Sequence, residues 1–168
     1  REYDGTVLFV SHDRDEVYRI SDRIAVYKGG AIDVMGDKWE LFRQPLTCTA
    51  AILTGCKNVS PAQYTDTTVS VPEWGVTLPL PQSGVPADAA YLGIRARKMR
   101  PARAAGPRCF AYTIAEEIDG AFSDILMISL DGGQTLLRWE LTKDVHAAMQ
   151  NGPQFIEIPE DAVLYLRA

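Results

Sequence analysis

The 168-residue chain has no long apolar run. No stretch approaches the roughly 18 to 20 consecutive apolar residues that a membrane-spanning helix requires. The first residues, REYDGTV, also lack the basic and then apolar pattern of a secretory signal peptide. With 46% hydrophobic and 23% charged residues, the composition is typical of a globular protein. We therefore expect any association with a membrane to depend on a partner.

Cysteine is scarce and irregularly spaced. The three cysteines, Cys48, Cys56 and Cys109, are odd in number and form no CxxC motif. This pattern predicts neither a disulfide framework nor a zinc site. A reducing, cytoplasmic setting is the expected consequence.

Positive charge is in deficit over the whole chain but is concentrated in one interval. The 17 Lys and Arg residues face 22 Asp and Glu, which gives a formal net charge of −5, whereas general nucleic-acid binders are usually basic. The interval between Ala89 and Ala115 has no acid and holds Arg95, Arg97, Lys98, Arg100, Arg103 and Arg108. Residues 95–108 contain no aromatic side chain on which a base could stack, so we expect no nucleic acid as partner. Two interpretations stay open, a patch that attracts anions and a solvated surface.

The first 24 residues predict a strand followed at once by a helix. Residues 6–10, TVLFV, form a continuous apolar run of β-formers, which is typical of a parallel strand covered on both faces. Asp13 followed by Glu16 resembles a capping box, so a helix should begin at or just after His12. Apolar residues then recur at helical spacing: Val17, Ile20 and Ile24.

The next 30 residues predict a hairpin and two short helices. Residues 24–28 and 31–35 flank Gly29-Gly30, which can adopt the positive φ angles of a two-residue turn. Asp37 can cap a short helix that must end before Pro45. Another helical piece, residues 47–53, should end at Gly55. This is α/β architecture, but a single strand of the buried kind does not make a sheet.

Short strands separated by turns dominate the rest of the chain. The alternation of β-formers with turn residues predicts eight strands, at residues 67–71, 76–80, 91–95, 110–118, 124–130, 134–140, 155–158 and 163–166. One brief helix is expected at residues 142–149. Many short strands with a single helix favour a small, partly open β-barrel of the OB type. The expected class for the whole chain is therefore α+β.

The opening segment resembles the switch-histidine region of ABC-transporter ATP-binding subunits. In that family, as in VLFVSHDRDEVYRISDRIAVYKGGAIDVMG, a strand ends in Ser/Thr-His-Asp, a helix follows, and a hairpin closes the nucleotide domain. The continuation DKWELFRQPLTCTAAILTGCKNV is similar to the family's tail after this hairpin. The resemblance implies that His12 is the switch histidine, which hydrogen-bonds the γ-phosphate and helps to hold the attacking water. A strand-end histidine satisfied by backbone groups is the alternative.

Several motifs of that family are missing from the sequence. No GxxxxGK[ST] loop occurs, and no apolar strand ending in Asp-Glu precedes His12. The sequence thus predicts a C-terminal piece of a longer ATPase that is inactive by itself. The stretch LDGGQ, residues 130–134, is one letter from the family's LSGGQ signature, but it follows His12 by more than 100 residues, whereas the family's signature precedes the histidine. We interpret it as a turn between two strands.

The second half resembles the accessory β-domain, of the TOBE or MOP-like type, on ATP-binding subunits of bacterial importers, in particular those for molybdate. The similarity rests on YLGIRARKMRPA and on FAYTIAEEIDGAFSDILMISLDGGQTLLRWELTKD. In molybdate-binding versions, backbone amides and a Ser-Ala-Arg-Asn type segment hold the oxyanion, and only Arg108 matches here. Arg108, Lys98 and Ser123 are the candidate donors to such a ligand. Exposed barrel surface is the alternative for these three residues.

These observations predict one architecture and one function. Residues 1–58 are expected to be the C-terminal end of an α/β P-loop nucleotide-binding domain, and residues 59–168 a regulatory OB-like β-barrel. The resemblance implies a cytoplasmic subunit of an ABC importer that uses ATP and Mg²⁺ when intact, with permease subunits and a second copy of itself as partners. The expected cargo is molybdate, tungstate or sulfate, with sugars and polyamines left open. A stand-alone oxyanion-binding or storage protein is the rival hypothesis, although it would not need residues 5–56.

Overall fold

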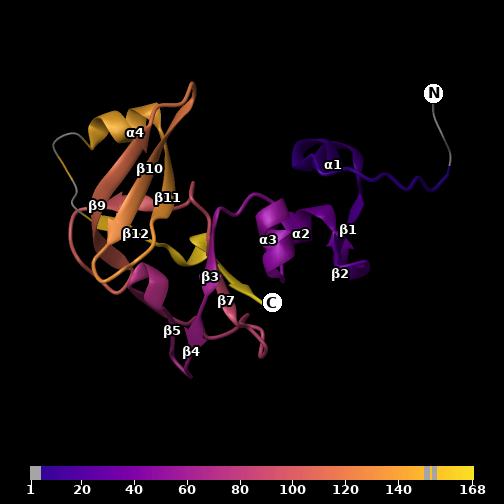
Figure 1. Cartoon of the computed structure of the whole chain (residues 1–168), viewed down its shortest axis with the longest axis horizontal. Coiled ribbons are helices and arrows are strands. Elements are labelled where there is room, and N and C mark those ends of the chain that lie inside the picture. Colours follow the sequence, from indigo (N-terminus) through magenta and orange to yellow (C-terminus); the bar gives the residue numbers. More distant parts are fainter. Residues whose placement is uncertain (1–4, 150–151, 153–154) are drawn as a thin grey trace.

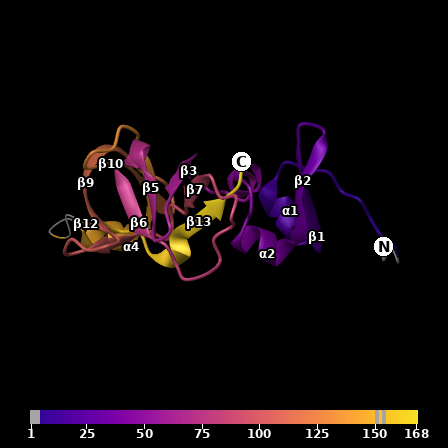
Figure 2. The ribbon, with the colours of Figure 1, turned by 90° about the horizontal axis from the view of Figure 1, so that it is seen from below.

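The chain folds into two lobes joined through a short helix. The computed structural model describes residues 5–149, 152 and 155–168. We call residues 5–57 the helical lobe and the described part of residues 58–168 the strand lobe. The two lobes lie side by side along the longest axis, and the C-terminus lies between them in both ribbon views (Figures 1 and 2). No helix in the described part of the chain is long and apolar enough to cross a membrane.

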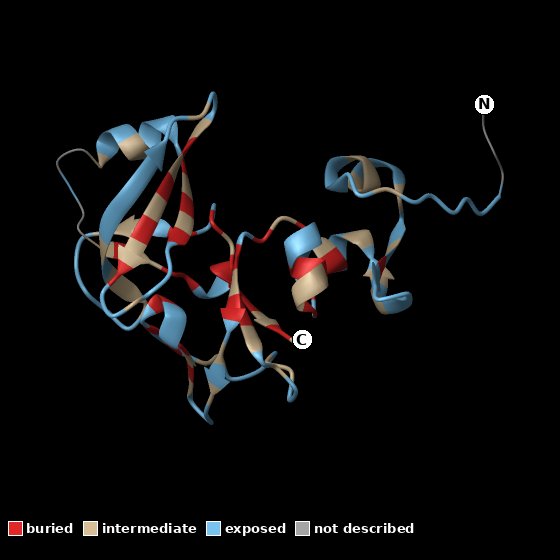
Figure 3. Ribbon diagram, viewed as in Figure 1, coloured by how far each residue is buried: buried red, intermediate tan, exposed pale blue. Residues whose placement is uncertain are grey.

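The predicted buried strand at residues 6–10 is wrong. The segment has no regular secondary structure and runs away from the helical lobe as an exposed chain (Figures 1 and 3). Val7 is 69% exposed, Leu8 91% and Val10 88%. A parallel strand requires neighbouring strands for its hydrogen bonds, and none of the described strands pairs with this segment.

The helix predicted after His12 is confirmed and begins at a well-formed cap. Helix α1 spans Arg14–Ile20, and the Asp13 carboxylate accepts hydrogen bonds from the backbone N–H groups of Asp15 and Glu16 at 2.9 and 3.0 Å. The pKa of Asp13 is lowered, chiefly by the Glu16 N–H and next by that of Asp15. These bonds satisfy two of the donors that the first turn of a helix leaves free.

The hairpin and the two short helices of the helical lobe are also confirmed. Strands β1 (Arg23–Lys28) and β2 (Ala31–Asp37) pair antiparallel, with Lys28 opposite Ala31 across the turn. Gly29 and Gly30 form that turn with φ angles of 59° and 84°, which glycine adopts without steric cost. Helices α2 (Lys38–Arg43) and α3 (Cys48–Leu53) follow.

The strand lobe contains three open antiparallel sheets. Their strand orders are β11-β10-β9-β12-β8, β13-β7-β3 and β4-β5-β6. The strand bounds are β3 Asn58–Pro61, β4 Gln63–Tyr64, β5 Thr68–Val71, β6 Val76–Pro79, β7 Tyr91–Ile94, β8 Arg100–Ala102, β9 Cys109–Ile118, β10 Ser123–Leu130, β11 Leu137–Thr142, β12 Phe155–Glu157 and β13 Val163–Leu166. Helix α4 spans Lys143–Ala148, and the 3-10 turns η1 and η2 span Pro72–Trp74 and Glu160–Ala162. The chain is thus mixed α and β, as expected, but the OB-like barrel is not confirmed because no described sheet closes on itself.

The main hydrophobic core lies between the sheets of the strand lobe, where buried residues concentrate in Figure 3. Trp139, Leu126 and Ile156 are fully buried there, and the Trp139 indole N–H donates to the Met99 carbonyl at 3.1 Å. Asn58 joins two of the sheets, because its side-chain amide donates to the carbonyls of Ile94 and Arg138 at 3.1 and 2.9 Å.

Helix α3 connects the two lobes. It packs against the β1–β2 hairpin on one side and against β3, β7 and β13 on the other. The end of the chain returns to the same place, since the Arg167 N–H donates to the Leu46 carbonyl at 2.9 Å and the Cys48 N–H donates to the Arg167 carbonyl at 3.1 Å. These contacts place the helical lobe directly beside β13.

Candidate functional site

His12 lies in an exposed bend between the coil at residues 5–10 and helix α1. The preceding residue fixes the bend, because the Ser11 hydroxyl donates to the Glu16 carboxylate at 2.8 Å and accepts from the Asp13 N–H at 3.1 Å. One half of the predicted capping box is therefore direct, the Glu16 N–H to the Asp13 carboxylate, and in the other half the Ser11 hydroxyl bridges the Asp13 N–H and the Glu16 carboxylate. The result is a histidine held at the start of a helix with its side chain open to a ligand.

No cluster of metal-ligating side chains lies beside His12 among the residues that the structure describes. Across residues 5–149, 152 and 155–168, no three His, Cys, Asp or Glu side chains gather as a metal ion would require.

Two of the three candidate oxyanion donors lie beside the same turn, η2. The Lys98 ammonium donates to the carbonyl and to the carboxylate of Asp161 at 2.9 and 3.1 Å. The Arg108 guanidinium donates to the Pro79 carbonyl at 2.9 Å and lies 3.9 Å from the Glu160 carboxylate. Carboxylates therefore neutralise part of the positive charge at both residues.

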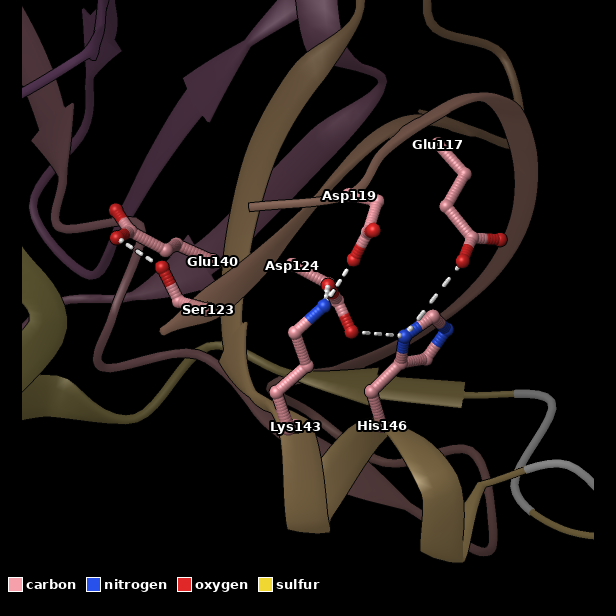
Figure 4. Close-up of polar contacts among 7 residues, drawn as sticks. All are labelled: Glu117, Asp119, Ser123, Asp124, Glu140, Lys143 and His146. Atoms are coloured by element: carbon pink, nitrogen blue, oxygen red, sulfur yellow. Dashed lines mark hydrogen bonds and ion pairs between the residues drawn. The ribbon is translucent and has the colours of Figure 1, made fainter. Parts of the chain in front are cut away.

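The third candidate, Ser123, lies elsewhere. It begins strand β10, and its hydroxyl donates to the Glu140 carboxylate on β11 at 2.9 Å (Figure 4). The structure thus brings Lys98 and Arg108 to one turn and leaves Ser123 apart from them, at the start of an interior strand of the five-stranded sheet. The role of these three residues in oxyanion binding stays a prediction.

A polar cluster that the sequence analysis missed surrounds Asp124 on strand β10. The Asp124 carboxylate is buried and accepts from the Lys143 ammonium at 2.6 Å and pairs with His146 Nδ1 at 2.8 Å (Figure 4). Glu117 and Asp119 lie at the rim, with the Glu117 carboxylate 3.7 Å from His146 Nδ1 and the Asp119 carboxylate bonded to Lys143. These contacts hold α4 on the five-stranded sheet.

The pKa of Asp124 is lowered to about 2, first by the hydrogen bond from Lys143 and then by that from His146. Lys143 responds in the opposite direction, because its hydrogen bonds to Asp119 and, second, to Asp124 raise its pKa. Lys143 and His146 are three residues apart and therefore share one face of α4. That spacing was a usable sequence signal, although it does not reveal that Asp124 is the partner.

The comparisons with known proteins point to one class, the ATP-binding subunits of ABC importers. The chain is 34% identical over 82 residues to the Fe(3+) ions import ATP-binding protein FbpC 1 of Pectobacterium atrosepticum, an alignment that covers 49% of the chain and 23% of the relative. It is 35% identical over 81 residues to FbpC of Escherichia coli strain K12, covering 48% and 23%. The Spermidine/putrescine import ATP-binding protein PotA of Nitratidesulfovibrio vulgaris is 28% identical over 151 residues, covering 83% and 41%. No protein-family model matches the chain.

These relatives support the broad resemblance inferred from the switch-histidine segment. The chain spans 23% of the length of each of the two iron-import relatives and 41% of the polyamine-import relative. All three names specify Fe(3+) ions or spermidine and putrescine. They therefore do not support the molybdate, tungstate or sulfate cargo that the sequence predicted.

Proposed function

We propose that the chain is the C-terminal part of the ATP-binding subunit of an ABC importer. The observation that carries this proposal is the alignment with the polyamine-import relative, which covers 83% of the chain and so includes residues of both lobes. A stand-alone oxyanion-binding protein would leave the similarity of the helical lobe without a reason. In the intact subunit, ATP hydrolysis would drive import through permease subunits at the cytoplasmic face of the membrane.

In this proposal, His12 is the switch histidine. Its place immediately before the capped start of α1, in an exposed bend, suits a side chain that must reach a phosphate on another part of the subunit. A positioned imidazole can hydrogen-bond the γ-phosphate and orient the attacking water. The 168-residue chain by itself should not hydrolyse ATP, because its sequence contains no GxxxxGK[ST] loop to hold the phosphates.

Residues 59–168 would form the accessory regulatory domain, of the TOBE or MOP-like type, and residues 1–58 the end of the nucleotide-binding domain. The five-stranded sheet supports a role in contacts at its β8 edge, because no described strand pairs with the outer side of β8, whereas Asn58 of β3 already bonds the backbone of β11 at the other edge. Edge strands present unpaired backbone groups that a neighbour can cover. A second copy of the subunit is the proposed neighbour, as ATP-binding subunits of this class work in pairs.

For the cargo we propose Fe(3+) or a polyamine, and we take Fe(3+) first because most of the similar proteins carry that name. Percentage identity does not separate the two cargoes, since PotA proteins are 28% identical over 151 residues and 38% over 60, against 34% and 35% over about 80 residues for the two FbpC proteins. The test is uptake of radiolabelled Fe(3+) and of labelled spermidine by cells with and without the gene that encodes the subunit. Loss of iron uptake alone, restored by the wild-type gene, is the expected result. Unchanged uptake of both compounds would contradict the proposed cargo. Loss of spermidine uptake alone would show that the cargo is a polyamine and not Fe(3+).

A further inference from the structure

An open cleft lies between the two lobes. It has a volume of about 770 Å³ and is lined by residues of α1 and α2 from the helical lobe and of β11 from the strand lobe. This volume falls within the range of about 300–1,000 Å³ that is typical of small-molecule sites. Asn58 fixes one wall, because its amide oxygen accepts from the Arg138 N–H at 2.8 Å and so holds β11 beside β3.

The cleft is strongly cationic although the chain as a whole is acidic. Two acidic side chains line it, Asp15 and Glu140, against six cationic ones: Arg14, Arg43, Lys57, Arg95, Arg97 and Arg138. The formal net charge of the whole chain is −5. Cationic side chains gathered in a concave surface raise the local concentration of anions. The acid-free interval noted in the sequence thus splits, with Arg95 and Arg97 at this cleft and Lys98 and Arg108 at η2.

The two acids neutralise only part of this charge. Glu140 pairs with Arg97 at 2.6 Å and lies 4.0 Å from Arg138. Arg138 Nε is buried and has no hydrogen-bond partner in the described part of the chain. A buried donor without an acceptor is costly. Arg138 lines the cleft, and at 4.0 Å the Glu140 carboxylate is only loosely paired with its guanidinium, which leaves that group able to engage an anion.

Two further cations line the cleft, Arg43 at the end of α2 and Lys57 in the segment between α3 and β3. Both are exposed, and neither forms an ion pair with any residue that the structure describes. Arg95 is oriented differently, since its guanidinium donates to the Phe42 carbonyl at the end of α2, and burial lowers its pKa. Arg43 and Lys57 are therefore the cations most available to a ligand.

We propose that this junction cleft binds a small multivalent anion, one that carries two or more phosphate or carboxylate groups. Guanidinium groups match both kinds of oxyanion through paired N–H donors. Because the ligand would touch both lobes, its binding would stabilise their arrangement. The proposal rests on the described side chains alone and does not depend on the importer function.

The cleft also contains a natural reporter of binding. Trp39 lines it and is 62% exposed, whereas the other two tryptophans, Trp74 and Trp139, are 4% and 0% exposed. A ligand in the cleft should therefore change the fluorescence of Trp39 and little else. Trp39→Phe should abolish the fluorescence change and leave the heat of binding measured by calorimetry in place.

The experiment titrates the 168-residue chain with pyrophosphate and, separately, with citrate at low ionic strength. We expect saturable binding of at least one anion, weakened by added salt because salt screens exposed charges. The double variant Arg43→Glu/Lys57→Glu should bind at least about tenfold more weakly, which corresponds to about 1.4 kcal/mol. The control Arg103→Glu, an exposed arginine that does not line the cleft, should bind within about twofold of wild type.

The two probes also separate the two chemistries, since stronger binding of pyrophosphate indicates a phosphorylated ligand and stronger binding of citrate a polycarboxylate. If the double variant is unstable in thermal unfolding, Arg43→Gln/Lys57→Gln replaces it, with an expected loss of about threefold or more. Failure of both anions to bind, or equal affinity in the charge variants and wild type, would overturn the proposal. Neither outcome affects the importer proposal, because no ATP hydrolysis is measured.

Discussion

Ala50 and Ala51, consecutive residues of α3, are both fully buried, and each belongs to a different hydrophobic cluster. Ala50 packs with Val26 and Leu41 in the helical lobe. Ala51 packs with Cys56, Leu164 and Leu166, which are mainly residues of the strand lobe. Successive residues of a helix point about 100° apart, so one short helix can serve both clusters only if both side chains are small.

This arrangement predicts that Ala50→Leu and Ala51→Leu each lower the free energy of unfolding, by about 1–3 kcal/mol, because a well-packed core does not accept extra methyl groups. The measurement is chemical denaturation of each variant. Ala147→Leu on the exposed face of α4 is the matched control and should change stability by less than about 0.5 kcal/mol. Two core variants as stable as the control would show that α3 is not packed on both sides.

Asp124→Asn should lower the melting temperature by several degrees at neutral pH, because it removes the carboxylate that Lys143 and His146 share. Since the folded-state pKa of Asp124 is lowered to about 2, its contribution to stability is complete above its unfolded pKa of about 4. That contribution is lost as the pH falls from about 4 towards 2. The difference in melting temperature between wild type and variant should therefore shrink over this range.

The control for this pH dependence is Asp66→Asn, which alters an exposed carboxyl group in the loop between β4 and β5. Its melting temperature should follow that of wild type at every pH. A difference between wild type and Asp124→Asn that stays constant from pH 7 to pH 2 would contradict the assigned pairing.

A third prediction concerns Gly75, the residue that follows η1, because the backbone of the LDGGQ turn at residues 131–133 packs against it. Gly75 has a φ of 67°, and a Cβ there would lie 2.5 Å from the Asp131 carbonyl oxygen and 2.7 Å from the Gly133 nitrogen. Gly84 has a comparable φ of 90°, with nothing within 4 Å of the position that a Cβ would take. Gly75→Ala should therefore be less stable than Gly84→Ala by about 1–3 kcal/mol in denaturant unfolding. Equal losses would mean that backbone strain alone matters at Gly75.

Cys56 should react much more slowly with iodoacetamide than Cys109. Cys56 is 2% exposed, its thiol donates to the Asn58 carbonyl at 3.3 Å, and burial raises its pKa. The thiolate is the reactive form, so both effects slow alkylation. Mass spectrometry of the native chain should show a difference of at least about tenfold, which disappears in denaturant. Equal rates in the native chain would show that the lobe junction opens readily.

The sequence located those elements whose signals are local. The cap at Asp13, the turn at Gly29-Gly30 and the turn between β10 and β11 each depend on a few adjacent residues, and all three are confirmed. The strand predicted at residues 6–10 was wrong because strand formation depends on partners distant in sequence, which a continuous apolar run does not reveal.

Three strands were missed, β3, β8 and the two-residue β4, and β11 was misplaced. β3 and β8 contain Pro61 and Pro101, which break the strand pattern, and both strands are sheet edges, where proline is tolerated. β11 begins three residues later than predicted because the N–H groups of Gln134 and Thr135 donate to the Glu73 carbonyl on η1. Neither the pairing of Asp124 with α4 nor the gathering of arginines at the cleft could be predicted from the sequence, because both depend on contacts between residues far apart in the chain.

The central proposal is that this chain is part of an importer ATPase and that His12 is its switch histidine, and one experiment tests it most directly. It compares ATP turnover and nucleotide affinity of the full-length subunit with those of its His12→Ala and His146→Ala variants, since these are the two histidines of the chain. We predict that His12→Ala lowers turnover by about a hundredfold or more with nucleotide affinity nearly unchanged, because the imidazole acts on the hydrolytic step. His146→Ala should retain near-normal turnover. Normal turnover in His12→Ala, or a collapse of nucleotide affinity with normal turnover per bound ATP, would contradict the account.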